Sequence, residues 1–166
     1  MRLKMVATSA GRFREDKTAV EGPQLLADLP DEFEHRDTLI GVCNQLRALA
    51  DQLEATGMKD IRLLRAQLHV EETAEFILGM LMRDDLATFD ALLDTTYVLG
   101  GSIEVLGFAD AYEDGFAEVH GANMRKPDGK QVRVRDKGAD WVPPNLEAVF
   151  KRHGFTPRIS DELKGV

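Results

Sequence analysis

The chain has 166 residues, of which 43% are hydrophobic and 30% are charged, proportions that are typical of one globular domain rather than of a disordered segment. Its formal net charge of −8 argues against nonspecific binding to nucleic acid, because a phosphate backbone is contacted by basic surfaces. Cys43 is the only cysteine, which excludes a disulfide framework and favours a small buried residue in a reducing, cytoplasmic setting. We find no signal peptide and no apolar run of about 20 residues, so we expect a protein without a membrane partner.

The N-terminal third contains an irregular arm followed by one amphipathic segment. Residues 1–35 mix glycine, proline and charge without a sustained period, which predicts an arm with one helical turn near 24–29. From 35 to 55, apolar residues recur every three or four positions, which predicts a helix that ends before Gly57. Its apolar stripe consists of Leu39, Val42, Leu46, Leu49, Ala50 and Leu53.

Three further helices are predicted between residues 59 and 125. The first runs from 59 to 82 with Asp60 near its positive end, and the second runs from 86 to 106, with Asp85 as its N-cap and Gly107 as its end. The third runs from 111 to 125, with Asp110 as a capping residue. Short connections between these segments favour antiparallel neighbours in a helical bundle.

The C-terminal segment differs in character from the helical part. In 126–144, a Pro-Asp-Gly turn precedes alternating valine and charged residues, which predicts a short strand or hairpin that acts as a clasp. Asn145 is then the expected N-cap of a last helix, 146–153. We therefore predict a single all-α domain: an arm at 1–35, a core of four main helices at 36–125, and a clasp, helix and tail at 126–166. Dimerisation would complete the core of such a bundle.

Three carboxylates lie where the second predicted helix should be apolar. Glu71, Glu72 and Glu75 occupy the two middle turns of its apolar stripe. Burial of three unpartnered carboxylates would cost several kcal/mol each or would force them to protonate, so an inward cluster implies a compensating cation. The apolar positions that define this stripe are Ile61, Leu64, Leu68, Leu78 and Met82.

The next helix supplies two more acids on one face. Asp90 and Asp94 are four residues apart, and the face continues through Tyr97 and Gly101. Two antiparallel helices that meet at these faces would bring up to five carboxylates together. Such an all-oxygen set suits Mg²⁺ or Mn²⁺ rather than zinc.

Each acidic cluster has an ordinary structural alternative. A Glu-Glu-x-x-Glu cluster on a helix is usually a solvated face that forms salt bridges with basic residues three or four positions away. Here Arg65 lies before the acids, and the next basic residue after them is Arg83, which is too far along to pair. The scarcity of partners, together with the like-charge pair on the next helix, favours the metal site over the solvated face.

The order of these motifs resembles that of a known superfamily. The segment 71–75 (Glu-Glu-Thr-Ala-Glu), followed by Asp94 and a Tyr-Val-Leu-Gly-Gly run, is similar to the signature of the all-α nucleoside triphosphate pyrophosphohydrolases. That superfamily includes MazG, phosphoribosyl-ATP pyrophosphohydrolase and dimeric dUTPase-type enzymes. One departure is that Ala91 stands where the family has an acid, so that Asp90 would replace it. Residues 118–126, Trp141 and the two prolines at 143–144 resemble the phosphoribosyl-ATP-pyrophosphohydrolase-like subgroup, and the resemblance covers 60–153.

The resemblance implies hydrolysis of a nucleoside triphosphate between the α and β phosphates, with Mg²⁺ as the cofactor and Mn²⁺ as a substitute. By this similarity, the metal ligands are Glu72, Glu75, Asp94 and, as the replacement ligand, Asp90. Glu71, about 100° around the helix from Glu72, would hold the nucleophilic water or a further metal.

The resemblance also implies where the substrate binds and what the partners are. Asn123, Lys126, Lys137 and Tyr97 are the candidate substrate-binding residues, and a homodimer or higher homo-oligomer is expected. Similarity to the subgroup favours a pyrimidine deoxynucleotide such as dUTP, in sanitation of the nucleotide pool. Two alternatives stay open: hydrolysis of phosphoribosyl-ATP in histidine synthesis, and a helical dimer that binds a nucleotide without catalysis.

Overall fold

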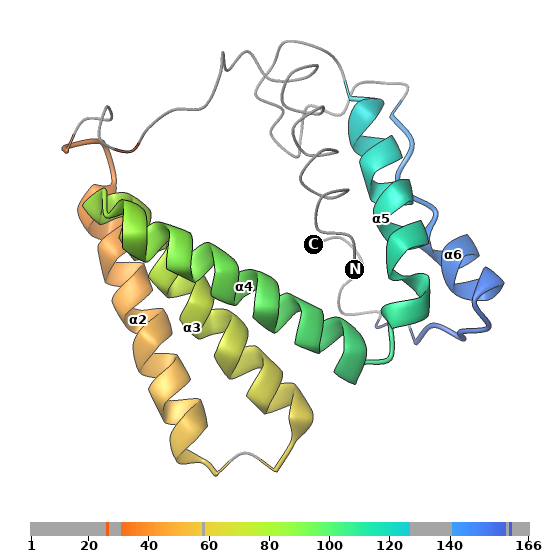
Figure 1. Ribbon diagram of the computed structural model, residues 1–166, viewed down its shortest axis with the longest axis horizontal. Helices are drawn as coiled ribbons and strands as arrows, with labels where there is room; N and C mark the ends of the chain where they lie inside the picture. The colour runs from red at the N-terminus through yellow and green to blue at the C-terminus, as the bar shows by residue number, and fades with distance from the viewer. Residues whose placement is uncertain (1–25, 27–30, 58, 127–140, 159, 161–166) are drawn as a thin grey trace. The chain divides into compact units, whose positions relative to one another are not determined.

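The chain is all-α in the part that the computed structural model describes, namely residues 26, 31–57, 59–126, 141–158 and 160. This part contains five α-helices and no strand, which confirms the predicted fold class (Figure 1). The predicted hairpin and most of the N-terminal arm lie outside these residues. The helices are α2 (Arg36–Ala55), α3 (Ile61–Met82), α4 (Asp85–Val105), α5 (Ala109–Met124) and α6 (Leu146–Arg152).

The chain divides into two compact units. The first unit, Pro23–Leu106, contains α2, α3 and α4, and the second contains α5 and α6 from Gly107 onward. The division falls at Gly107, whose φ of 77° suits a residue without a Cβ. The predicted core of 36–125 therefore includes elements of both units. None of the described helices is long and apolar enough to cross a bilayer.

Helix α3 is the central element of the first unit, because it packs against both α2 and α4 (Figure 1). At one end of the α3–α4 contact, a Cβ placed on Gly79 would lie 2.8 Å from Thr88 Oγ1, so only glycine permits this approach. At the other end, His69 Nε2 and Ser102 Oγ form a hydrogen bond of 2.8 Å. These two contacts fix the spacing of the helices on both sides of the acidic turns.

The helix starts agree with the sequence at two positions and differ at two. Asp60 lies at the positive end of α3 as predicted, although the helix begins at Ile61 rather than at 59, and its side chain accepts a hydrogen bond from the Arg62 amide as the N-cap. Asn145 caps α6 through the Ala148 amide, as predicted. The prediction of Asp85 as a cap was wrong, because the preceding Asp84 accepts from the Ala87 amide. The cap at Asp110 was also wrong: α5 begins two residues earlier than predicted, which places Asp110 inside its first turn.

The predicted apolar stripe of α2 is only partly buried. Leu39, Val42 and Leu49 are exposed, whereas Cys43, which is 1% exposed, and Ala50 are buried. Small residues occupy the contact because they let two helix backbones come close together. The expectation for Cys43 is therefore confirmed, and the leucine-based stripe is corrected.

In helix α3, too, the predicted apolar stripe is not the buried face. Ile61, Leu64 and Met82 of its predicted stripe are exposed, and the buried positions are Gln67, Ala74 and Gly79. The acids lie on the stripe, but the stripe is the open side of α3 between its contacts with α2 and α4.

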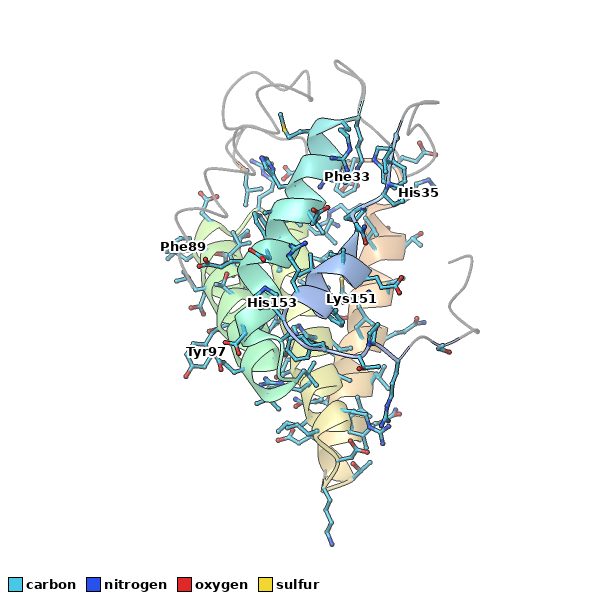
Figure 2. All side chains as sticks on the ribbon, turned by 90° about the vertical axis from the view of Figure 1, so that its right-hand side faces the viewer. Phe33, His35, Phe89, Tyr97, Lys151 and His153 are labelled. Carbon is cyan, nitrogen blue, oxygen red and sulfur yellow. The ribbon has the colours of Figure 1, made fainter. Side chains whose placement is uncertain are left out.

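One face of α4 carries large exposed apolar side chains. Leu86 is 82% exposed, Phe89 61%, Leu93 50% and Tyr97 83%, and their spacing of three and four residues places them on one side of the helix. Figure 2 shows Phe89 and Tyr97 pointing outward along the same side of the helix. We call these four residues the α4 outer face. Asp90 and Asp94 border it, about 40–80° around the helix from Leu86 at 100° per residue.

The second unit is held together by aromatic and polar contacts. The rings of Phe108 and Phe150 stack with their centres 5.6 Å apart, and Phe155 contacts both. Trp141 Nε1 donates a hydrogen bond of 3.1 Å to the Ala122 carbonyl. This bond holds the segment that precedes α6 against α5.

Candidate functional site

Two recesses lie beside α3, and we call them together the groove. Glu71 and Glu75 each line one of them, whereas Glu72 and Asp94 line neither. One recess of this groove, with a volume of about 270 Å³, brings Glu75 of α3 together with Asp90 and Ala91 of α4 and with Arg47 of α2. A second recess of about 260 Å³, between α2 and α3, contains Glu71 and again Arg47. The groove thus unites acids that the sequence assigned to two helices.

Glu72 is the electrostatic centre of the cluster. Its Oε2 atom is buried and accepts no hydrogen bond from any residue in the described part of the chain. Burial raises the pKa of this carboxyl, and the nearby charges of Asp94, Glu75, Glu71 and Asp90, in that order, raise it further. All five predicted acids therefore interact, and each of the other four disfavours the charged form of Glu72.

The five carboxylates are neighbours but do not converge on one point. Within the described residues, no three Asp, Glu, His or Cys side chains lie close enough together to hold a metal ion as they stand. Like charges repel, and the side chains of Glu75, Asp90 and Asp94 are exposed and can therefore turn toward water. These oxygen donors, which include the unpartnered buried oxygen of Glu72, are the ligand type that a hard divalent cation prefers.

The ordinary alternative, a face of intrahelical salt bridges, does not describe these acids. None of the five forms an ion pair with a residue that the structure describes. Arg83 pairs with Asp31, and the Arg65 guanidinium lies over Gly101, where a Cβ would be 2.9 Å from Arg65 Nη1. The nearest basic residues of α3 are therefore directed elsewhere.

Glu71 differs from the other acids in having a defined partner. The side-chain amide of Gln67 donates a hydrogen bond of 2.7 Å to Glu71 Oε2. Gln67 is buried, so this bond restricts the orientation of the Glu71 carboxylate at the edge of the recess. A carboxylate held in this way has one oxygen engaged and one available to a ligand or a water molecule.

The predicted substrate-binding residues are dispersed. Tyr97 belongs to the α4 outer face and lines neither recess. Asn123 lies near the end of α5 and Lys126 just beyond it, in the second unit, where the Lys126 amide donates to the Asn123 carbonyl. Lys137 falls outside the described residues. The predicted face through Asp90, Asp94 and Tyr97 therefore divides into an acidic border and an outward apolar part.

Two residues beside the acids, Gln67 and Arg47, have roles that the sequence did not predict. Gln67 has a signal in the sequence, because glutamine four residues before glutamate is a favourable helix pair. Arg47 has no such signal, because its position beside Glu71 and Glu75 depends on how α2 packs against α3.

Comparisons with protein-family models, with curated proteins and with solved structures find no match for this chain.

Proposed function

We propose that this protein is a Mg²⁺-dependent nucleoside triphosphate pyrophosphohydrolase, which releases a nucleoside monophosphate and pyrophosphate. The observation that supports this proposal best is the environment of Glu72, whose buried, unpartnered oxygen is surrounded by four other carboxylates from two helices. Such a cluster stores unfavourable electrostatic energy unless a cation joins it. The resemblance of segment 71–75 and Asp94 to the pyrophosphohydrolase signature supports the same function.

The proposal divides the acids by role. Glu72, Glu75, Asp94 and Asp90 hold the metal, which when bound would offset the charge of the triphosphate and of the leaving pyrophosphate. Glu71 orients the attacking water and accepts its proton, since Gln67 fixes one oxygen of its carboxylate and leaves the other available. The groove walls keep the scissile phosphate beside these groups.

We further propose that the protein acts as a homodimer through the α4 outer face. Four large apolar side chains on one side of a helix form a surface that a monomer seldom leaves in water. Because Asp90 and Asp94 border this face, a partner would lie beside the acidic groove. Asn123, Lys126, Lys137 and Tyr97 are kept as candidate contacts of the substrate in that assembly.

A panel of ribo- and deoxynucleoside triphosphates tests the proposed activity. The full chain is incubated with each nucleotide and Mg²⁺ or Mn²⁺, and pyrophosphate and monophosphate are measured as separate products. We expect equal amounts of both products and no activity in EDTA. Release of inorganic phosphate instead would indicate cleavage at the γ position and would contradict the proposal.

A non-catalytic role is the second candidate, and the position of Ala91 favours it. Ala91 is buried beside Asp90 and Glu75 in the groove, where the related enzymes have an acid. A site that lacks this ligand would bind metal and nucleotide without turnover. Calorimetric binding of Mg²⁺ and nucleotide, with no pyrophosphate released by any member of the panel, is the result that selects this alternative.

A further inference from the structure

Helix α4 carries three hydroxyl side chains at intervals of seven residues, on the side that faces α3. Thr88 contacts Gly79 of α3, and Ser102 forms a hydrogen bond with His69 of α3. Thr95 stands midway, seven residues from each of the other two hydroxyls. Because seven residues turn a helix by almost two full turns, Thr95 lies on the same side and also faces α3.

The hydroxyl of Thr95 has no hydrogen-bond partner among the described residues, although its Oγ1 atom is buried. The other two threonines of α4 differ in this respect. Thr88 Oγ1 donates to the Asp84 carbonyl at 2.6 Å, and Thr96 Oγ1 donates to the Leu92 carbonyl at 2.9 Å. A buried hydroxyl without a partner costs free energy, and valine would fill the same space without that cost. The hydroxyl of Thr95 therefore calls for an acceptor.

The register of the two helices places Glu72 opposite Thr95. From the contact between Gly79 and Thr88, Glu72 lies seven residues back along α3, and Thr95 lies seven residues onward along α4. Seven residues correspond to about 10 Å of helix, so the two side chains reach the same level of this antiparallel pair. Oε2 of Glu72 is also buried without a hydrogen-bond partner in the described part of the chain.

Two further observations agree with this register. Arg65, seven residues before Glu72, has its guanidinium at Gly101, six residues after Thr95, where an added Cβ would lie 2.9 Å from Arg65 Nη1. After burial, the charge of Asp94, the residue before Thr95, is what raises the pKa of the Glu72 carboxyl most. The α3–α4 contact thus contains two buried, unpartnered oxygens at one level, a carboxylate oxygen and a hydroxyl.

We propose, on the basis of the metal site in the function above, that Thr95 is a positioning residue for Glu72. Its hydroxyl donates a hydrogen bond to Oε2 of Glu72 while the other oxygen of this carboxylate binds the cation. Carboxylates that bind metals are commonly held by such hydrogen bonds, and loss of the supporting group weakens metal binding. Neither oxygen is hydrogen-bonded in the structure, so the proposed bond belongs to the metal-bound state.

Equilibrium binding of Mn²⁺ to the full chain, without nucleotide, tests this role by calorimetry. Thr95→Val keeps the shape of the side chain and removes the hydroxyl, so it should raise the dissociation constant by about tenfold. Thr95→Ser keeps the hydroxyl and should stay within about threefold of wild type. The matched control is Thr96→Val, the same change one residue further along, which removes a hydroxyl bonded to the Leu92 carbonyl and should change the dissociation constant by less than about twofold.

A double-mutant cycle tests whether Thr95 acts through Glu72. The remaining acids are expected to bind Mn²⁺ more weakly in Glu72→Ala. Adding Thr95→Val to this variant should weaken binding by less than about a further twofold, because the carboxylate that Thr95 positions is absent. A further loss of about tenfold would show that Thr95 contacts the cation directly and would contradict the positioning role.

Thermal unfolding in EDTA separates this role from a structural one. Thr95→Val removes an unpartnered buried hydroxyl, so the metal-free variant should be at least as stable as wild type. A less stable variant with wild-type affinity for Mn²⁺ would show that the hydroxyl serves the core alone, and would refute the inference.

The outcomes also separate this inference from the proposed function. Wild-type affinity for Mn²⁺ in Thr95→Val would overturn the inference even if the chain hydrolyses triphosphates. The expected pattern of affinities without release of pyrophosphate from any triphosphate would support the role of Thr95 while removing the proposed activity. Absence of Mn²⁺ binding by wild type would overturn both.

Discussion

Gln67 and Glu71 stand one turn apart on α3, and the buried amide of Gln67 donates a hydrogen bond of 2.7 Å to Glu71 Oε2. This bond gives one of five similar carboxylates a fixed orientation. It therefore separates a group suited to water activation from groups suited to metal binding, a distinction that spacing along the helix cannot make.

Replacement of Gln67 by Leu should reduce kcat more than it changes KM. The bond contributes about 0.5–1.5 kcal/mol, which corresponds to a roughly two- to tenfold loss if Glu71 is correctly oriented only part of the time. Steady-state kinetics with Mg²⁺ measures both parameters, and Gln52→Leu, at an exposed position of α2, is the control. An unchanged kcat would mean that Glu71 does not act on the reacting water.

Glu72→Gln and Asp94→Asn should each lower turnover by more than about a hundredfold while the helical circular dichroism spectrum is retained, because each removes a charge from the metal site. Calorimetric titration with Mn²⁺ should show weaker binding in both variants. Full metal affinity with turnover lost would move these residues from the metal to another role.

The contribution of Glu72 to the stability of the metal-free protein should be lost as the pH rises. Its pKa is raised in the folded state, first by burial and then by the other acids, so folding favours the protonated form. Its contribution to the free energy of unfolding is therefore complete below the pKa of the unfolded chain, about 4.3, and is lost as the pH rises through the folded-state pKa.

Urea denaturation in EDTA at several pH values measures this effect as the difference between wild type and Glu72→Gln. The difference should decline from about pH 4 upward. Hydrogen bonds with Arg62 lower the pKa of Asp60 to about 2, so the contribution of Asp60 to stability changes with pH in the opposite direction. This contribution is the same in both proteins and cancels in the difference. A difference that does not vary with pH would show that burial and the neighbouring acids do not raise the pKa of Glu72.

In the proposed site, Asp90 should serve as the acid that the pyrophosphohydrolases, which this sequence resembles, have at the position of Ala91. Asp90→Ala is expected to raise the Mg²⁺ concentration needed for half-maximal activity, and adding Ala91→Glu should partly restore it, since Ala91 lines the same recess as Glu75. The measurement is activity against Mg²⁺ concentration. Wild-type activation in Asp90→Ala would remove Asp90 from the site.

A charge on the α4 outer face should prevent self-association. Leu93→Glu places a carboxylate at the centre of the proposed interface and should give a monomer in sedimentation velocity, whereas wild type should sediment as a dimer. Leu49→Glu, at an exposed leucine of α2, is the control and should leave the mass unchanged. A monomeric wild type would refute the proposed interface.

The sequence predicted the helices well because their ends carry local signals. Gly57 and Gly107 follow α2 and α4 closely, and Asn145 caps α6 as expected. It also placed the five acids near one another, since the spacing of charges within a helix follows from its period.

The parts that were not predicted depend on how the helices pack. Period analysis selects large apolar residues, but the contacts are made by Cys43, Ala50 and Ala74, which let the helices approach closely. Arg47 belongs to the groove only because α2 lies against α3, and nothing in its neighbours along the chain indicates this. Long-range packing, rather than local propensity, decided these positions.

Because the single cysteine is buried in α2, its reaction with a thiol reagent measures the local opening of this helix without an engineered label. The Cys43 thiol is 1% exposed, and burial raises its pKa, so a thiol reagent can modify it only when α2 separates locally from its neighbours. The modification rate thus reports the opening free energy of the helix that carries Arg47. A nucleotide that bridges α2 and α3 should slow this reaction in proportion to its occupancy, whereas a metal held by α3 and α4 alone should leave it almost unchanged.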